Sequence, residues 1–222
     1  MIPPRQSAGF VANMEDVLDL YCRPYDPRTP VVNMDEQPVQ LVKETRQPLP
    51  ASPGQTERFD YEYERRGVAN VFMFVEALAG WRSVDARQRK TACDWAMEIR
   101  ALLDGRYACA EKVILICDNL NTHKTAALYE VFPPAEARRL ARRLEIHYTP
   151  KHGSWLNIAE CELSAFTRQC LSGRVPDLAT LADTARLWQA DRNARQKRIN
   201  WRFTTTDARI KLNQLYPEIQ MS

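Results

Sequence analysis

The sequence of 222 residues lacks the segments that mark several common classes of protein. It has no apolar run close to the roughly 20 residues that a membrane-crossing helix needs. Its first ten residues, MIPPRQSAGF, contain no apolar core of a signal peptide. The GxxxxGK[ST] loop that holds nucleotide phosphates is also missing. We therefore predict a cytoplasmic protein without a membrane partner and exclude a P-loop enzyme.

Patterns typical of zinc sites and disulfide frameworks are missing too. The six cysteines are scattered, they form no CxxC pair, and no paired histidines lie near them. Structural zinc sites and small disulfide-bonded domains both depend on regular spacings of these residues. We therefore predict neither, and we expect reduced thiols.

The composition is that of an ordinary soluble globular protein, with 45% hydrophobic and 27% charged residues. The length suits one core, or one core with an appendage. Charge is distributed unevenly: residues 1–137 carry 16 Lys and Arg against 20 Asp and Glu, whereas residues 138–222 carry 15 against 8. The basic C-terminal third indicates either a polyanionic partner or a solvated basic face.

The chain is organised around the stretch KVILICDNLNTHKTAA, residues 112–127. Five apolar residues, 113–117, end abruptly at Asp118, which predicts a strand buried on both faces. Ligands of open α/β sheets bind at the carboxyl ends of the strands, so Asp118 is a candidate for chemistry. Ordinary turn chemistry that ends a strand is the alternative interpretation.

Other strands are expected at residues 31–36, where Asp35 and Glu36 close the pattern, and at 68–75, 81–86 and 145–149. The polar, proline-rich segment 43–64 is predicted to be a long excursion or a hairpin arm. Helical periodicity and end signals predict helices over residues 10–22, 91–103, 124–131, 133–144, 158–171 and 178–192, with a capped helix within 204–217.

This order of elements matches an RNase H-like fold, an α/β fold with a mixed central sheet flanked by helices. In that fold the first and fourth strands lie side by side, which would bring Asp35, Asp118 and Glu160 together. Clustered carboxylates repel one another and favour divalent cations with oxygen ligands, Mg²⁺ or Mn²⁺. Two such ions about 3.5–4 Å apart activate a water or a 3′-hydroxyl and stabilise the leaving oxygen of a phosphodiester.

Four motifs in order carry a family resemblance: VVNMDEQP around Asp35, ILICDNLNTHK around Asp118, TPKHGSWLNIAE around Glu160, and INWRFTTTDARIKL near the C-terminus. From about Asp26 onward the chain resembles the DDE transposases of bacterial insertion sequences related to the mariner elements, within the RNase H and retroviral-integrase superfamily. The resemblance implies a metal-dependent DNA endonuclease and strand transferase. It also implies two Mg²⁺ ions, with Mn²⁺ as substitute, held by Asp35, Asp118 and Glu160. Transposon ends and target DNA would be the partners of a homodimer at the bacterial nucleoid.

The choice of Glu160 over Glu162 depends on this resemblance, through the Asn157-x-x-Glu160 spacing. Helical geometry does not separate the two glutamates. A capping box, in which Glu160 bonds back to the backbone at Asn157, is the alternative role for Glu160.

Basic and aromatic residues supply candidate DNA contacts, each weighed against a solvated or structural role. Trp155 would either stack on a base or anchor its loop. Residues Asn119, Asn121, His123 and Asn157 are candidates for supporting the metal ligands or contacting DNA. The proposed DNA contacts are Arg138, Arg139, Arg142, Arg143, Lys151, His152, Trp155, Arg195, Lys197 and Arg198.

We divide the chain into a linker and N-terminal helix (1–30), the catalytic core (31–175) and a basic helical extension of the same domain (176–222). Two features depart from the family. The interval between Asp118 and Glu160 is longer than in animal mariner elements, and only about 30 residues precede the core, where relatives usually carry helix-turn-helix modules. We therefore expect a truncated, split or excised catalytic domain. The competing functions are an RNase H-like nuclease without strand transfer and an inactive, transposase-derived DNA-binding protein.

Overall fold

The computed structural model describes residues 7–46, 49–56, 58 and 61–218. Its centre is a five-stranded sheet in the order β3-β2-β1-β4-β5. The strands are β1 (Val31–Glu44), β2 (Tyr63–Glu76), β3 (Trp81–Arg87), β4 (Val113–Cys117) and β5 (Leu144–Tyr148). The pairs β1–β2 and β2–β3 are antiparallel, whereas β1–β4 and β4–β5 are parallel. This confirms the mixed sheet and the neighbouring first and fourth strands.

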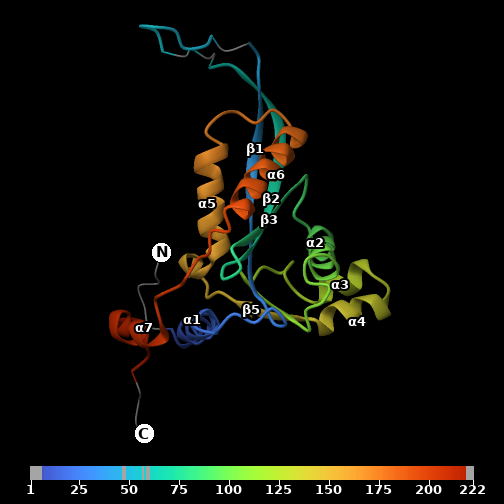
Figure 1. Ribbon diagram of the computed structural model, residues 1–222, viewed down its shortest axis with the longest axis vertical. Coiled ribbons are helices and arrows are strands. Elements are labelled where there is room, and N and C mark those ends of the chain that lie inside the picture. Colours follow the sequence, from blue (N-terminus) through green and yellow to red (C-terminus); the bar gives the residue numbers. More distant parts are fainter. Residues whose placement is uncertain (1–6, 47–48, 57, 59–60, 219–222) are drawn as a thin grey trace.

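Helices cover both faces of this sheet (Figure 1). They are α1 (Ala8–Tyr21), α2 (Ala92–Asp104), α3 (Ala126–Val131), α4 (Pro134–Arg142), α5 (Ile158–Cys170), α6 (Leu178–Ala194) and α7 (Thr205–Lys211). Short 3₁₀ turns at Ser154–Leu156 and Asn213–Leu215 precede α5 and follow α7. In the described part of the chain, no helix is long and apolar enough to cross a bilayer.

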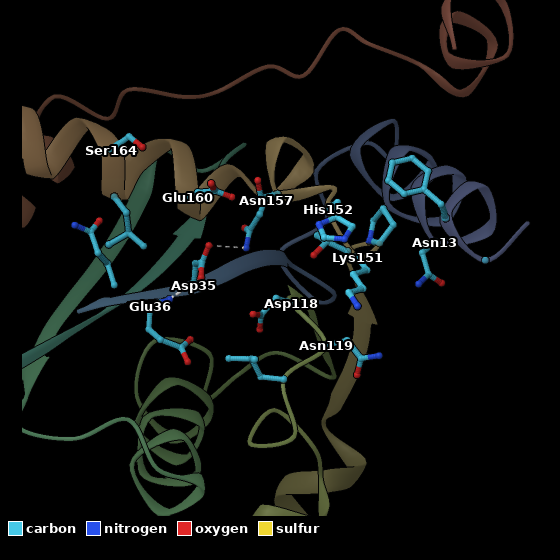
Figure 2. A pocket seen from close by; sticks show the side chains of 18 of the residues that line it. Asn13, Asp35, Glu36, Asp118, Asn119, Lys151, His152, Asn157, Glu160 and Ser164 are labelled. Carbon is cyan, nitrogen blue, oxygen red and sulfur yellow. Dashed lines mark hydrogen bonds between the residues drawn. The ribbon is translucent and has the colours of Figure 1, made fainter. Parts of the chain in front are cut away.

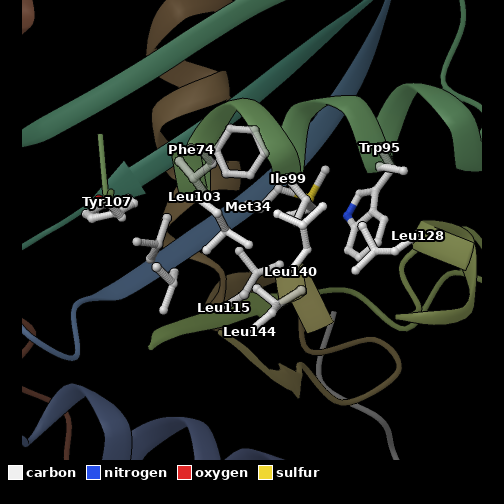
Figure 3. Packing of buried hydrophobic residues seen from close by; sticks show 14 of the residues in the cluster. Met34, Phe74, Trp95, Ile99, Leu103, Tyr107, Leu115, Leu128, Leu140 and Leu144 are labelled. Carbon is white, nitrogen blue, oxygen red and sulfur yellow. The ribbon is translucent and has the colours of Figure 1, made fainter. Parts of the chain in front are cut away.

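One apolar core lies between the sheet and α2, α3 and α4, and Figure 3 shows its centre. Val32 and Met34 of β1 point into it together with Leu115 of β4. Burial of large apolar side chains of this kind stabilises a fold by roughly 1.5–3 kcal/mol each. The largest helical contribution comes from Trp95, which is fully buried.

A second core lies on the opposite face, between the long strands and the helices α5 and α6. Val39 and Leu41 of β1 contribute to it. Because successive side chains of a strand point to opposite faces, Asp35 shares the α5 side with these residues and Glu36 shares the α2 side with Met34. A third cluster seats α1 and α7 over Ile114 and Ile116 of β4. All five residues of β4 are buried, as predicted.

The C-terminal end predicted for the strand at residues 31–36 is wrong. Instead of stopping at Asp35 and Glu36, β1 continues to Glu44 and pairs with β2 along its whole outer half. On its other side, β1 pairs with β4 only through Val31, Val32 and Asn33. Beyond Asn33 that side of β1 is a sheet edge in the described part of the chain, where Pro38 is tolerated because no partner strand there needs its missing N–H. The two strands form a hairpin arm (Figure 1), which confirms that alternative for residues 43–64; residues 47–48, 57 and 59–60 lie outside the described part.

The strand predicted at 68–75 begins earlier, at Tyr63, because it pairs with the extended β1, and the other predicted elements are confirmed with small shifts of their ends. Helix α4 stops at Arg142, and the C-terminal helix covers Thr205–Lys211. That helix is capped as expected: Thr204 and Asp207 bond reciprocally to each other's backbone N–H groups.

Candidate active site

A cavity of about 1120 Å³ opens at the carboxyl end of β4. It lies between the start of α1, β1, the loops that follow β4 and β5, and the first turns of α5. Asp35, Asp118 and Glu160 all line it, and Figure 2 shows their carboxylates facing the same space. Three elements that are remote in sequence therefore bring the three predicted metal ligands to one cavity.

Asp35 is held in place by hydrogen bonds from its neighbours. The backbone N–H of Glu36 donates to Oδ1 at 2.8 Å, and the amide of Asn157 donates to Oδ2 at 3.3 Å. Burial is the main reason why the pKa of Asp35 is raised to about 7, and the Glu36 N–H opposes it. The negative charges of Asp118, Glu36 and Glu160 raise this pKa further.

Asp118 follows the last residue of β4 directly and contacts the buried ring of His123. The ring nitrogen Nδ1 lies 2.7 Å from Asp118 Oδ1 as an ion-pair contact, while its N–H is directed at the Asp118 backbone carbonyl at 3.3 Å. On the other side, Nε2 lies 3.1 Å from Oε1 of Glu36. Burial disfavours a charge on the ring, but the neighbouring side chains of Asp118, Cys117 and Glu36 outweigh it and raise the imidazole pKa to about 12. This raised pKa favours the protonated ring between the two carboxylates.

Glu160 lies in the first turn of α5, where the positive end of the helix dipole favours a carboxylate. Asn157 caps this helix by accepting from the N–H of Ala159 at 3.1 Å. The backbone N–H of Asn157 donates to Ser154 O at 2.8 Å, so this donor is already used and does not form a capping box with Glu160. The carboxylate of Glu160 is left to face the cavity.

Glu162 is excluded from the cavity by its buried ion pairs. Its carboxylate contacts Arg82 at 3.1 and 3.2 Å and Arg192 at 2.8 and 2.9 Å. Burial alone would raise the pKa of Glu162, but these two guanidinium groups lower it below its ordinary value. The structure thus separates two glutamates that helical periodicity left equivalent.

The donor set at the cavity fits a divalent cation. Carboxylate oxygens are the ligands that Mg²⁺ and Mn²⁺ prefer, and the carboxylates of Asp35, Asp118 and Glu160 all line this cavity. Within the described residues, no three His, Cys, Asp or Glu side chains are already gathered in a geometry that could hold an ion. Joint coordination therefore requires the side chains of Asp35, Asp118 and Glu160 to move closer together.

Of the predicted DNA contacts, Lys151 and His152 line the cavity. His152 has a φ of 66°, a left-handed conformation that is uncommon for residues other than glycine. It occupies a tight turn closed by the Gly153 N–H, which donates to Pro150 O at 2.8 Å. Trp155 packs against Trp201 with ring centroids 6.5 Å apart, an arrangement that favours the anchoring role.

The arginines of α4 lie at the other end of the sheet edge. Arg139 forms a bidentate pair with Asp104, and Arg143 donates to backbone carbonyls that include Tyr107 O. Leu144 pairs with Val113 at the start of β4, about 13 Å from the C-terminal end of that strand at the usual rise per residue. Side chains of Arg138 and Arg142 are exposed on this helix.

The basic segment after α6 holds the remaining predicted DNA contacts. Arg195 pairs with Asp191 at 2.7 Å, and Lys197 and Arg198 are exposed. The backbone of this segment packs on the β2–β3 turn, where the Ile199 N–H donates to Ala77 O at 2.9 Å.

Sequence reasoning missed the role of Glu36, whose side chain is only 2% exposed. The alternation of β1 was the available signal, because it turns Glu36 toward the core face of Val32 and Met34. A carboxylate on that face requires a partner, and His123 provides it. Of the other polar candidates, Asn119 lines the cavity, whereas Asn121 accepts from Lys124 at the surface.

Comparison with known proteins places this geometry in a wider group. Residues 30–182 match the family described as DDE superfamily endonuclease. No curated protein sequence matches the chain at a significant level.

Solved structures of the Mos1 mariner transposase share the fold. The Mos1 catalytic domain superposes with a TM-score of 0.59 at 12% identity, covering 98% of this chain and 100% of that one. The Mos1 paired-end complex with Mn gives 0.57 at 17% identity, over 89% of this chain and 60% of that chain. The pre-cleavage Mos1 transpososome gives 0.59 at 15% identity, over 99% and 65%. This chain thus spans less than two thirds of the longer Mos1 chains.

Proposed function

This chain belongs to the DDE superfamily of endonucleases, and on that premise we propose that it is the catalytic domain of a transposase. In this proposal it cuts DNA and joins 3′-hydroxyl ends to a target by transesterification. The observation that carries the proposal is the meeting of Asp35, Asp118 and Glu160 at one cavity. The Mos1 complexes, whose names include paired ends and strand transfer, support DNA as the partner.

We propose Asp35, Asp118 and Glu160 as ligands of two Mg²⁺ ions, which Mn²⁺ can replace. When bound, such ions activate the attacking oxygen and stabilise the leaving one, so no protein nucleophile is needed. The chain itself orients the ligands: Asn157 fixes Asp35 through its amide, and the first turn of α5 carries Glu160.

Phosphate binding is the proposed role of the basic candidates. Lys151 and His152 would contact DNA at the cavity, and the exposed side chains Arg138, Arg142, Lys197 and Arg198 would add affinity without sequence preference. Arg139, Arg143 and Arg195 would first have to exchange their intramolecular partners. We further propose a homodimer in the DNA complex, working at the bacterial nucleoid.

The test is an assay of cleavage and joining with Mn²⁺. Asp118→Asn should abolish cleavage and leave DNA binding largely intact, whereas Asp183→Asn, at a site with 72% exposure, should cleave like the wild type. Unchanged cleavage by Asp118→Asn would overturn the assignment. Pre-cleaved DNA ends provide the second arm of the test. Wild-type protein that cleaves intact DNA but never joins pre-cleaved ends to a target is an RNase H-like nuclease. Wild-type protein that binds DNA and neither cleaves nor joins it is an inactive derivative.

A further inference from the structure

Glu36 and His123 form a buried pair directly behind Asp118. Their side chains are 2% and 1% exposed, and His123 Nε2 lies 3.1 Å from Glu36 Oε1. The other ring nitrogen lies 2.7 Å from Asp118 Oδ1. The imidazole thus spans the space between a residue of β1 and the carboxylate that follows β4.

The ring of His123 is held by its surroundings as well as by the two carboxylates. It stacks on Trp95, with centroids 6.0 Å apart and planes at 30°. The backbone is fixed at both ends of the residue: its carbonyl accepts from the Tyr148 hydroxyl at 2.8 Å, and its N–H donates to Leu120 O at 3.1 Å. A ring fixed in this way can impose one orientation on a neighbour.

The two oxygens of Asp118 have different surroundings. Oδ1, the oxygen beside His123, is buried and receives no directed hydrogen bond from the described residues. Yet the side chain of Asp118 as a whole is 41% exposed and lines the cavity. The exposed oxygen is therefore Oδ2.

We propose that Glu36 and His123 are positioning residues, which turn Oδ2 of Asp118 toward the metal site by occupying the space and charge around Oδ1. The inference rests on the proposed function, in which Asp118 is a metal ligand and the orientation of its Oδ2 therefore matters. Glu36 also continues directly from Asp35, and its N–H bonds to Asp35 Oδ1. The contacts of Glu36 and His123 therefore link Asp118 to the segment of β1 that carries Asp35. This segment lies beyond the three residues of β1 that pair with β4.

Two substitutions of His123 separate its contacts. His123→Asn keeps a donor near the position of Nδ1, which faces Asp118, and His123→Gln keeps one near Nε2, which faces Glu36. The affinity of each variant for Mn²⁺ is measured by electron paramagnetic resonance in the absence of DNA. The melting temperature of each variant is measured in parallel in the presence of a chelator. We expect His123→Gln to weaken Mn²⁺ binding by about 10- to 100-fold, the usual effect of losing such a supporting contact, and His123→Asn to lose much less.

Substitutions of Glu36 supply a second test, which stays informative even where a His123 variant fails to fold. Glu36→Ala should weaken Mn²⁺ binding, and Glu36→Gln, which keeps an acceptor for the ring, should recover most of it. Equal Mn²⁺ affinities for His123→Asn and His123→Gln, or for Glu36→Ala and the wild type, would overturn this inference and leave the proposed function standing. Wild-type protein that binds no Mn²⁺ would overturn the proposed function together with it.

Discussion

Glu160 and Glu162 lie two residues apart on α5, yet one faces the cavity and the other is buried against Arg82. We therefore expect their amide variants to fail in different ways. Glu160→Gln should lose Mn²⁺-dependent cleavage with little change in unfolding free energy, within about 0.5 kcal/mol. Glu162→Gln should lower the melting temperature and still cleave below it. Chemical denaturation beside a cleavage assay checks both, and the reverse pattern would exchange the two assignments.

The buried Arg82 should be among the most sensitive positions for stability. Its side chain is 0% exposed and also donates to Lys197 O at 2.7 Å. Replacing it by Met leaves Arg192 as the guanidinium partner of Glu162, so the cost should be below the roughly 3–5 kcal/mol of a fully unpaired buried charge and above that of an exposed pair. The matched control is Arg186→Met, which breaks an exposed pair with Asp183 worth at most about 1 kcal/mol. Similar losses in urea unfolding would contradict the buried role of Arg82.

The raised pKa of Asp35 predicts a pH dependence of stability in chelator. In the folded protein this pKa is about 7, against an ordinary value of 3.8 in the unfolded chain, so folding favours the protonated form. The contribution to stability is therefore full below pH 3.8 and is lost as the pH rises through about 7. A tenfold difference in proton affinity between the folded and unfolded states corresponds to about 1.4 kcal/mol.

Asp35→Asn removes this titration and keeps an acceptor for the Glu36 N–H. We expect the variant to become more stable than the wild type as the pH rises from 5 to 8, on the order of 1 kcal/mol or more after screening by solvent. Unfolding measured across this pH range provides the check. Added Mn²⁺ should stabilise only the wild type, and identical pH profiles would show that burial does not strain Asp35.

Gly80 should not accept a side chain. Its φ is 70°, and a Cβ there would lie 2.7 Å from the backbone oxygen of Gln196. Gly80→Ala therefore combines a left-handed penalty of about 1–2 kcal/mol with a clash against the segment after α6. Gly54→Ala is the control, since φ is 80° there and nothing lies within 4 Å. A loss of stability no greater than that of the control would show that the 196–199 segment moves aside freely.

Much of the site could be predicted because its signals are local. Five apolar residues stopped by Asp118 specify a buried strand and place a carboxylate at its end. The Asn157 cap likewise locates the first turn of α5, where Glu160 lies.

The parts that could not be predicted depend on partners far away in the sequence. The end of β1 was misplaced because the polar residues Asp35, Glu36 and Gln37 resemble a strand end, whereas pairing with β2 carries the strand on. Glu162 could not be assigned either, since Arg82 comes from 80 residues earlier. Burial of an ion pair leaves no periodic signal in the sequence.

The continuity of β1 from Val31 to Glu44 also limits where the chain can gain or lose residues. One inserted residue between Asp35 and Val39 would turn both Val39 and Leu41 from the α5 core to the opposite face, because strand side chains alternate. Length variation among natural homologues should therefore concentrate between Glu44 and Tyr63, and the spacing from Asp35 to Leu41 should stay constant.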